Sequence, residues 1–320
     1  MTRRVVLAYS GGHGSSAALK LLAEQADVIA VAVDFGAGDV DFCALRRRAV
    51  SEGAAEVVVV DAREEFANGY CLPALQANAL VVDGHPLVAS LARPLLAKHL
   101  GAVAREHDTQ TVHPLTKARD VLVPNGIRVH ARTPHLSTSR TLWGRSVGQW
   151  ECTEDASVNL GVPDEVVVTF ERGVPIAVDG ETVRVAEAVQ RLGHRAGAHG
   201  IGRFEGQVSH EAPGAAALIA AHRELEAITL DRDLARFKHG VDRRWAELVS
   251  DGLWVSPLRR PLDAFVRQAQ ESVSGEVRLV LHAGRAAAAG RHLRPVGRRY
   301  RPGTGQTPLG STQHPNTQAS

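Results

Sequence analysis

Continuous apolar runs alternate with helical patterns along the first sixty residues of the chain. Three runs have the uninterrupted apolar character of strands that are covered on both faces: 5–9, 28–33 and 57–60. Two segments between them have helical patterns: 17–24 and 43–51, the second ended by Gly53. Strands and helices joined in this order by short connections predict a parallel α/β sheet with helices on its faces.

The remainder of the chain has a mixed pattern. Helices are predicted at 72–80, 87–106, 213–230 and 235–249, and strands at 166–170, 174–178 and 277–281. The segment 133–154 is rich in Thr, Ser and Arg and is expected to be a loop. We therefore expect an α/β nucleotide-type domain over residues 1–125, an α+β domain over 126–290, and a disordered Pro-, Gly- and Arg-rich tail over 291–320.

Composition and charge exclude several functional classes. The chain has 320 residues, with 37 Lys and Arg against 35 Asp and Glu, so its net charge of +2 predicts neither a nucleic-acid nor a membrane partner. No apolar run approaches the roughly 20 residues that span a bilayer. The three cysteines, Cys43, Cys71 and Cys152, lack the spacing of a zinc site or a disulfide framework. These observations favour a cytoplasmic protein with small-molecule partners and no metal site of its own.

The candidate chemistry lies in the turn after the first strand, Ala8-Tyr9-Ser10-Gly11-Gly12-His13-Gly14-Ser15-Ser16. Such a turn aims backbone N–H groups and the positive end of a helix dipole at one point, and its glycines let a phosphate approach. A Walker loop is excluded because Gly-Lys-Ser/Thr is absent. A dinucleotide fingerprint fits Gly12-x-Gly14-x-x-Ala17 with Asp34 downstream. The Ser-Gly-Gly-x-Asp-Ser/Thr-Ser loop of ATP pyrophosphatases fits equally well except at Gly14, so this segment alone leaves both alternatives open.

Further segments, in order along the chain, resemble those of the argininosuccinate synthase family. They are VVLAYSGG at 5–12, VDAREEF at 60–66, PALQANAL at 73–80, LARPLLAK at 91–98, LWGRS at 142–146, AHRELE at 221–226 and GLWVSP at 252–257. The resemblance implies an ATP-binding domain of the adenine nucleotide α-hydrolase type followed by an α+β synthetase domain. It also implies the AMP-forming ligation of citrulline to aspartate in arginine biosynthesis, with ATP and Mg²⁺, in a homotetramer.

The resemblance also implies site residues. The ATP site would comprise Ala8, Tyr9, Ser10, Gly11, Gly12, His13, Gly14, Ser15, Ser16 and Val33, with the three serines as hydroxyl donors and Val33 acting through its backbone. Ser90, Ser137 and Ser146 fall at hydroxyl positions of the citrulline site. His85 and His210 stand where the family has tyrosines that face the substrate. No residue is assigned as catalytic.

The sequence departs from the family pattern at three places. Gly14 replaces the aspartate of the phosphate loop. The Gly-rich stretch H-G-x-T-G-K-G-N-D-Q, which holds the aspartate contacts, is missing after the helix that ends near Glu106. A V-E-N segment, whose Glu binds citrulline, is missing after 201–205. Alternatives to the named reaction are therefore a ligase with a different amine substrate and a non-catalytic relative.

Overall fold

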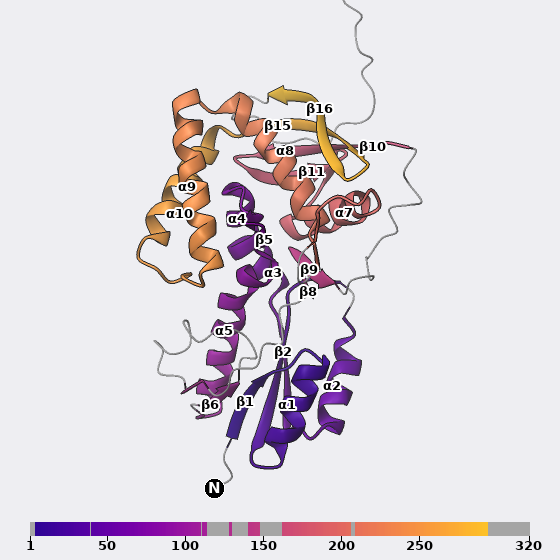
Figure 1. Cartoon of the computed structure of the whole chain (residues 1–320), viewed down its shortest axis with the longest axis vertical. Coiled ribbons are helices and arrows are strands. Elements are labelled where there is room, and N and C mark those ends of the chain that lie inside the picture. The colour runs from indigo at the N-terminus through magenta and orange to yellow at the C-terminus, as the bar shows by residue number, and fades with distance from the viewer. Residues whose placement is uncertain are drawn as a thin grey trace, which may run out of the picture.

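The computed structural model describes residues 4–38, 40–109, 111–113, 128–129, 140–147, 162–205 and 209–293 (Figure 1). The elements of the first half are β1 Arg4–Ala8, α1 His13–Ala23, β2 Asp27–Asp34, α2 Phe42–Ser51, β3 Glu56–Asp61, α3 Arg63–Phe66, a π-helical segment Ala67–Cys71, α4 Leu72–Gln76, β4 Val81–Val82, β5 His85–Pro86, α5 Val88–Glu106, β6 Thr111–His113 and β7 Arg128–Val129.

The elements of the second half are β8 Arg140–Thr141, β9 Gly144–Val147, β10 Asp164–Glu171, β11 Val174–Val178, β12 Glu181–Thr182, α7 Val185–Gly197, β13 Arg203–Phe204, β14 Ser209–Glu211, α8 Pro213–Thr229, α9 Arg232–Ser250, α10 Arg259–Ala269, a 3₁₀ turn Gln270–Ser272, β15 Gly275–His282 and β16 Arg285–Leu293.

The N-terminal sheet is parallel, with strand order β3-β2-β1-β6-β7. This confirms the α/β fold predicted from the apolar runs. Strand order reverses at β1, since β2 and β3 lie on one side of it and β6 and β7 on the other. In open parallel sheets, ligands bind beyond the carboxyl ends of the strands at such a reversal. The fold therefore places the turn after β1 where a ligand is expected.

Alternate residues of β1 and β2 are buried on opposite faces of this sheet. Leu7, Tyr9 and Val28 belong to the core formed with α1 and α2. Val6 and Val31 belong to the larger core that includes α5. Because both faces are covered, the strands are apolar throughout, which is why they were recognisable in the sequence.

The second half of the chain contains a five-stranded sheet of order β12-β11-β10-β15-β16, whose pairings are antiparallel. The hairpin predicted at 166–178 is confirmed as β10 and β11, which are joined through Arg172 and Gly173 at positive φ. Helices α7 and α8 pack together beside this sheet (Figure 1). A smaller sheet of order β13-β14-β9-β8 lies between the two halves (Figure 1).

The structure corrects four sequence-based predictions. Within the segment 133–154, predicted to be a loop, residues 140–147 form the hairpin β8–β9, whose outer partner β14 is about sixty residues away in the chain. The helix predicted at 72–80 ends at Gln76, because Asn78 adopts a positive φ of 48°. Helices α7 and α10 were not predicted.

The fourth correction concerns the tail. Strand β16 continues to Leu293, so the first three residues of the segment 291–320 pair with β15. The sequence RAAAAGRHL lacks the β-branched residues that indicate a strand, and the pairing with β15 determines its conformation instead. Residues 294–320 lie outside the described part of the chain, as does the boundary at residue 125, which stays a prediction. None of the described helices has the length and apolar character needed to cross a bilayer.

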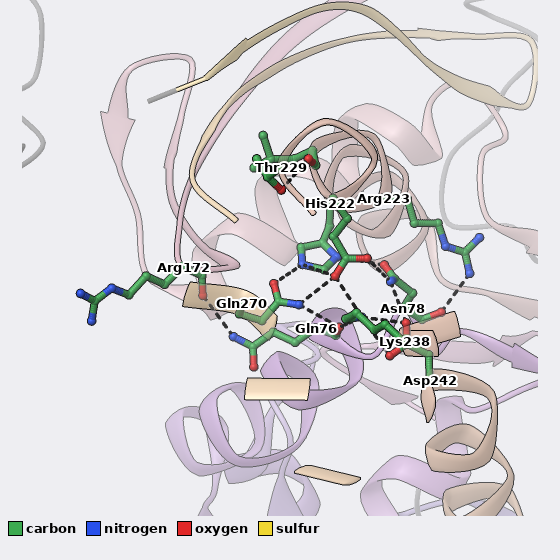
Figure 2. Close-up of polar contacts among 11 residues, drawn as sticks. Gln76, Asn78, Arg172, His222, Arg223, Thr229, Lys238, Asp242 and Gln270 are labelled. Carbon is green, nitrogen blue, oxygen red and sulfur yellow. Dashed lines mark hydrogen bonds and ion pairs between the residues drawn. The ribbon is translucent and has the colours of Figure 1, made fainter. Parts of the chain in front are cut away.

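A buried polar cluster joins the N-terminal half to helices α8 and α9 and to the 3₁₀ turn after α10 (Figure 2). It comprises Gln76, Asn78, His222, Glu226, Lys238, Asp242 and Gln270. Lys238 is 1% exposed, and its Nζ lies 2.7 Å from Asp242 Oδ2, 2.9 Å from Glu226 Oε1 and 2.7 Å from the Gln76 carbonyl oxygen. Asn78 Nδ2 donates to Glu226 and to Asp242. The cluster thus ties the end of α4 to α8 and α9.

His222 is fully buried in this cluster and lies between two amide groups. Its Nδ1 is 2.9 Å from Asn78 Oδ1, and its Nε2 is 2.8 Å from Gln270 Oε1. A ring that donates from both nitrogens is protonated, whereas burial lowers the pKa of His222 and so opposes that charge. Burial raises the pKa of Asp242, and the nearby Lys238 ammonium partly offsets this effect. Lys238 therefore provides most of the positive charge that offsets the carboxylates of Glu226 and Asp242.

Candidate functional site

Helix α1 presents an uncapped N-terminus at the carboxyl end of β1. Gly12 is the N-cap residue, and no side chain accepts a hydrogen bond from the first turn. Gly11, just before it, has a φ of 71°, which glycine adopts without strain. The free N–H groups of the first turn and the positive end of the helix dipole together make a site that favours an anion such as a phosphate.

The serines of this turn have two different roles. Ser15 is 3% exposed; its Oγ donates to the Gly12 carbonyl oxygen at 2.9 Å and accepts from the backbone N–H of Ser10 at 3.3 Å. Ser16 is also buried, at 5% exposure. Ser15 therefore fixes the shape of the turn, and Ser10, whose side chain is exposed, is the serine at the surface of the cleft described next.

A cleft of about 540 Å³ opens beside the turn. Its lining includes Tyr9, Ser10, Gly11, Gly12, Val31, Val33, Phe35, Asp41, Arg48, Leu96 and Arg140. We call it the nucleotide cleft, after the ligand that the sequence analysis expects at this turn. Its volume lies in the range of roughly 300–1,000 Å³ that is typical of small-molecule sites. Ala8, His13, Gly14, Ser15 and Ser16 belong to the same turn, but their side chains do not contribute to the lining. The structure thus brings Tyr9 to Gly12 together with Val33 in the lining of one cleft, and their role in ATP binding stays a prediction.

The charged groups of the nucleotide cleft are Arg48, Arg140 and Asp41. Tyr9 directs its hydroxyl to Glu52, donating to Oε2 at 2.7 Å, and the same carboxylate pairs with Arg48. Burial raises the pKa of Tyr9, so its phenol is neutral at physiological pH. Tyr9 therefore contributes the wall of the cleft and does not supply a charge.

Asp34 does not support the dinucleotide alternative. Its Oδ1 accepts the backbone N–H of Gly36 at 2.8 Å, and its Oδ2 lies 3.6 Å from Arg63 Nε. In a dinucleotide enzyme the equivalent carboxylate binds the ribose hydroxyls. Here the carboxylate instead fixes the turn that follows β2.

Three of the predicted substrate residues come from segments that meet at Gly144. A Cβ added at Gly144 would lie 2.5 Å from the Glu211 carbonyl oxygen and 2.9 Å from Val88 Cγ2. Ser146 and His210 are direct cross-strand partners in β9 and β14, and Ser90 is in the first turn of α5, just after Val88. The Ser146 hydroxyl is buried and bonds to no other group of the described residues.

Two predicted substrate residues remain, His85 and Ser137. His85 is exposed on the β4–β5 hairpin. Ser137 lies outside the described residues.

A second cleft, of about 450 Å³, lies next to the nucleotide cleft, and Arg140 lines both. We call it the arginine cleft. It is bounded by the turn at Gly36 and by α7, whose Gln190 donates to the Gly36 carbonyl oxygen at 3.3 Å. Glu211, 4% exposed, pairs with Arg145 at 3.1 Å and with Arg203 at 3.5 Å.

The charged side chains in the described lining of the arginine cleft favour an anionic ligand. That part of the lining contains three arginines, Arg140, Arg145 and Arg203, and one carboxylate, Glu211. The sequence analysis did not identify any of these four residues. Arg145 stands in the recognised LWGRS segment and Glu211 directly after His210, so adjacency to recognised positions was the available signal.

The described residues provide no preformed metal centre. No group of three or more His, Cys, Asp and Glu side chains among them is arranged to hold a metal ion. Asp41 is the one carboxylate in the described lining of the nucleotide cleft. This is compatible with Mg²⁺, which commonly binds through substrate phosphates, waters and one or two carboxylates.

Two family models match the chain. The Arginosuccinate synthase N-terminal HUP domain matches residues 4–122, and the Arginosuccinate synthase C-terminal domain matches residues 144–295. The first covers β1, β2, β3 and β6 of the parallel sheet and the turn after β1. The second covers β9 and the elements from β10 to β16, with the residues of the arginine cleft other than the Gly36 turn and residues 140–143.

Proposed function

The chain belongs to the argininosuccinate synthase family, and we propose that it is an ATP-dependent, AMP-forming carbon–nitrogen ligase that joins citrulline to aspartate in arginine biosynthesis. The single observation that carries the proposal is the uncapped N-terminus of α1 at the nucleotide cleft, at the point where strand order reverses. The family assigns ATP use to this domain.

The arrangement supports the reaction through positioning and charge. The backbone N–H groups at Gly12 to Gly14 and the Ser10 hydroxyl would bind the ATP phosphates, with Mg²⁺ carried by the nucleotide to offset their charge. The ureido oxygen of citrulline would attack the α-phosphorus, and pyrophosphate would leave. The amine of aspartate would then displace AMP. Holding citrulline beside the bound ATP would lower the entropic cost of the first step.

The acceptor would lie where Ser90, Ser146 and His210 come from adjoining segments. The buried Ser146 hydroxyl, which has no partner in the described part of the chain, is a ready hydrogen-bond donor for an amino-acid substrate. The arginine cleft would bind the carboxylates of the amine substrate, because the described part of its lining offers three guanidinium groups, which pair with carboxylates in two-pronged hydrogen bonds.

A pyrophosphate-release assay tests the proposal. Protein, MgATP, citrulline and aspartate are combined, and further reactions replace aspartate with other amino acids. Pyrophosphate release that requires citrulline is the expected result. No release with any acceptor and amine would refute the enzymatic proposal. The variant Ser10→Ala serves as the site control, and Lys20→Ala, on the exposed side of α1, serves as the matched surface control.

Two observations favour a second candidate, a relative that binds ATP without turnover or that uses another amine. Gly14 removes the loop carboxylate, and the segment that holds aspartate in the family is missing from this chain. A site that loses such partners loses selectivity of roughly 10⁴-fold or more. MgATP binding without pyrophosphate release would support a relative that binds ATP without turnover. Pyrophosphate release with an amine other than aspartate would support a ligase that uses another amine. Assembly into a homotetramer is part of the proposal, and sedimentation velocity measures it directly.

A further inference from the structure

Arg93 lies in the second turn of α5, between two residues of the candidate site on the same helix. Ser90 precedes it by three positions, and Leu96, which lines the nucleotide cleft, follows it by three. Residues three apart are neighbours on one side of a helix. This side of α5 therefore leads from the nucleotide cleft to the acceptor residue Ser90, and Arg93 is its midpoint.

The Arg93 guanidinium is partly buried and has no partner among the residues that the structure describes. Its Nε is buried without a hydrogen bond, and no ion pair or hydrogen bond links its side chain to another group in the described ranges. Burial lowers the pKa of Arg93, although a guanidinium remains charged at neutral pH. A buried charge whose donors are unpaired costs stability.

Other arginines with little exposure in the described residues do have counter-charges. Arg145 pairs with Glu211, and Arg195 pairs with Asp164 at 2.6 Å. Arg259 stacks on Trp254, with its guanidinium carbon 3.1 Å from the ring centroid, and lies 3.5 Å from Asp263. Arg93 differs from these three because no group in the described part of the chain compensates its charge. An unfavourable charge at a functional position is expected where a ligand supplies the partner.

We propose that Arg93 binds substrate, and that its guanidinium holds an anionic group at the junction between the nucleotide cleft and the acceptor residues. The planar guanidinium donates two parallel hydrogen bonds to a carboxylate or phosphate. Two groups of the proposed reaction offer this chemistry: the α-phosphate of the nucleotide and the carboxylate of the amino-acid acceptor. The identity of the anion rests on the proposed function, whereas the anion-binding role rests on the unpaired charge.

Three variants on α5 test this role. Arg93→Met keeps the length of the side chain and removes the charge. Arg93→Lys keeps the charge and loses the two-pronged geometry. Arg105→Met removes an exposed arginine from the last turn of the same helix and is the matched control. Melting temperature and ligand affinity are measured for each protein with AMP, MgATP and citrulline as separate probes.

For Arg93→Met we expect an unchanged or higher melting temperature together with weaker ligand binding. Without ligand, Arg93→Met melts at the same temperature as the wild type or higher, because an unpaired charge is removed. Its affinity for the ligand that carries the anion falls roughly 10- to 150-fold, the range for hydrogen bonds to charged groups. The ligand affinity of Arg93→Lys lies between those of the wild type and Arg93→Met, and the affinity of Arg105→Met equals that of the wild type. Weakened AMP and MgATP binding assigns the phosphate, and weakened citrulline binding assigns the carboxylate.

Other outcomes overturn the inference. A purely structural role predicts that Arg93→Met melts at a lower temperature and binds every probe as the wild type does. A wild-type protein that none of the probes stabilises also overturns it. The pyrophosphate assay separates this failure from that of the proposed function. An active enzyme whose Arg93→Met variant binds all probes normally refutes the role of Arg93 alone, and Arg93-dependent binding without turnover refutes the ligase alone.

Discussion

Replacing Lys238 by methionine removes the cation that holds the buried polar cluster together. The Lys238 ammonium contacts both oxygens of Asp242, at 2.9 and 2.7 Å, as well as Glu226 and the Gln76 carbonyl (Figure 2). Methionine fills a similar volume, so the change leaves the packing nearly intact. What remains is two carboxylates, each 8% exposed, without their counter-charge.

The burial of these two carboxylates determines how much stability Lys238→Met should lose. Breaking a buried ion pair by removing one partner costs about 3–5 kcal/mol. Single domains of 150–250 residues lose about 2–4 °C of melting temperature per kcal/mol, so Lys238→Met is expected to melt about 6–20 °C lower. Total stabilities are only about 5–15 kcal/mol. The substitution therefore removes a large part of the free energy of unfolding of the protein.

Urea denaturation followed by tryptophan fluorescence measures this loss. The control is Lys98→Met, which breaks the exposed pair with Glu65 and should cost less than about 1 kcal/mol. Adding Glu226→Gln and Asp242→Asn to Lys238→Met should restore part of the stability, because no unpaired charge then remains. A loss below about 1 kcal/mol in Lys238→Met, equal to that of the control, would show that the cluster does not carry the stability assigned to it.

The pH dependence of Lys238→Met provides a second readout. Without the ammonium, burial raises the pKa values of both carboxylates in the folded variant above their unfolded values. The folded state then binds more protons than the unfolded state as the pH rises through this window, so stability falls with rising pH. The deficit relative to the wild type should therefore be largest near neutrality and shrink on acidification toward about pH 4. A deficit that is constant with pH would contradict the electrostatic explanation.

Three further predictions concern single positions. Ser15→Ala should cost about 1 kcal/mol in urea denaturation by removing the hydrogen bonds that shape the turn, whereas Ser10→Ala should leave stability unchanged and weaken MgATP binding in calorimetry. Burial raises the pKa of Tyr70 to about 12 in the folded protein, so the unfolded state loses its phenol proton first as the pH rises. The free energy of unfolding should therefore fall by about 2–3 kcal/mol between about pH 10 and 12. Thermal melts at alkaline pH should show this fall in the wild type and not in Tyr70→Phe. In Gly144→Ala the new Cβ would lie 2.5 Å from the Glu211 carbonyl oxygen. The substitution should therefore lower the free energy of unfolding by about 2 kcal/mol or more in thermal melts and weaken acceptor binding. Unchanged stability would contradict that contact.

Much of the fold could be read from local pattern. The first three strands were predicted to within one or two residues, because burial on both faces makes them continuously apolar. Helix α8 was placed within one residue of its end, since Pro213 marks its first turn. The turn after β1 was recognised because glycine and serine are required there by backbone geometry and hydrogen bonding. These features depend on residues close together in the chain.

The remainder depended on contacts between distant segments. Strand β16, made largely of alanine, is a strand because β15 lies beside it, and the hairpin β8–β9 exists because β14 pairs with it. Arg140 and Lys238 gave no sequence signal, since a single charged residue is usually exposed to solvent, and the only signal for Arg93 was its place in the recognised segment 91–98. Their roles follow from what surrounds them: Arg93 has no partner among the described residues, Arg140 lines two clefts, and Lys238 contacts two carboxylates. Sequence alone determined the sheet, the phosphate-type turn and the family, because these follow from periodicity and local geometry. The tertiary structure decided which charges are buried, paired or left open, because burial and pairing arise only when distant segments pack together.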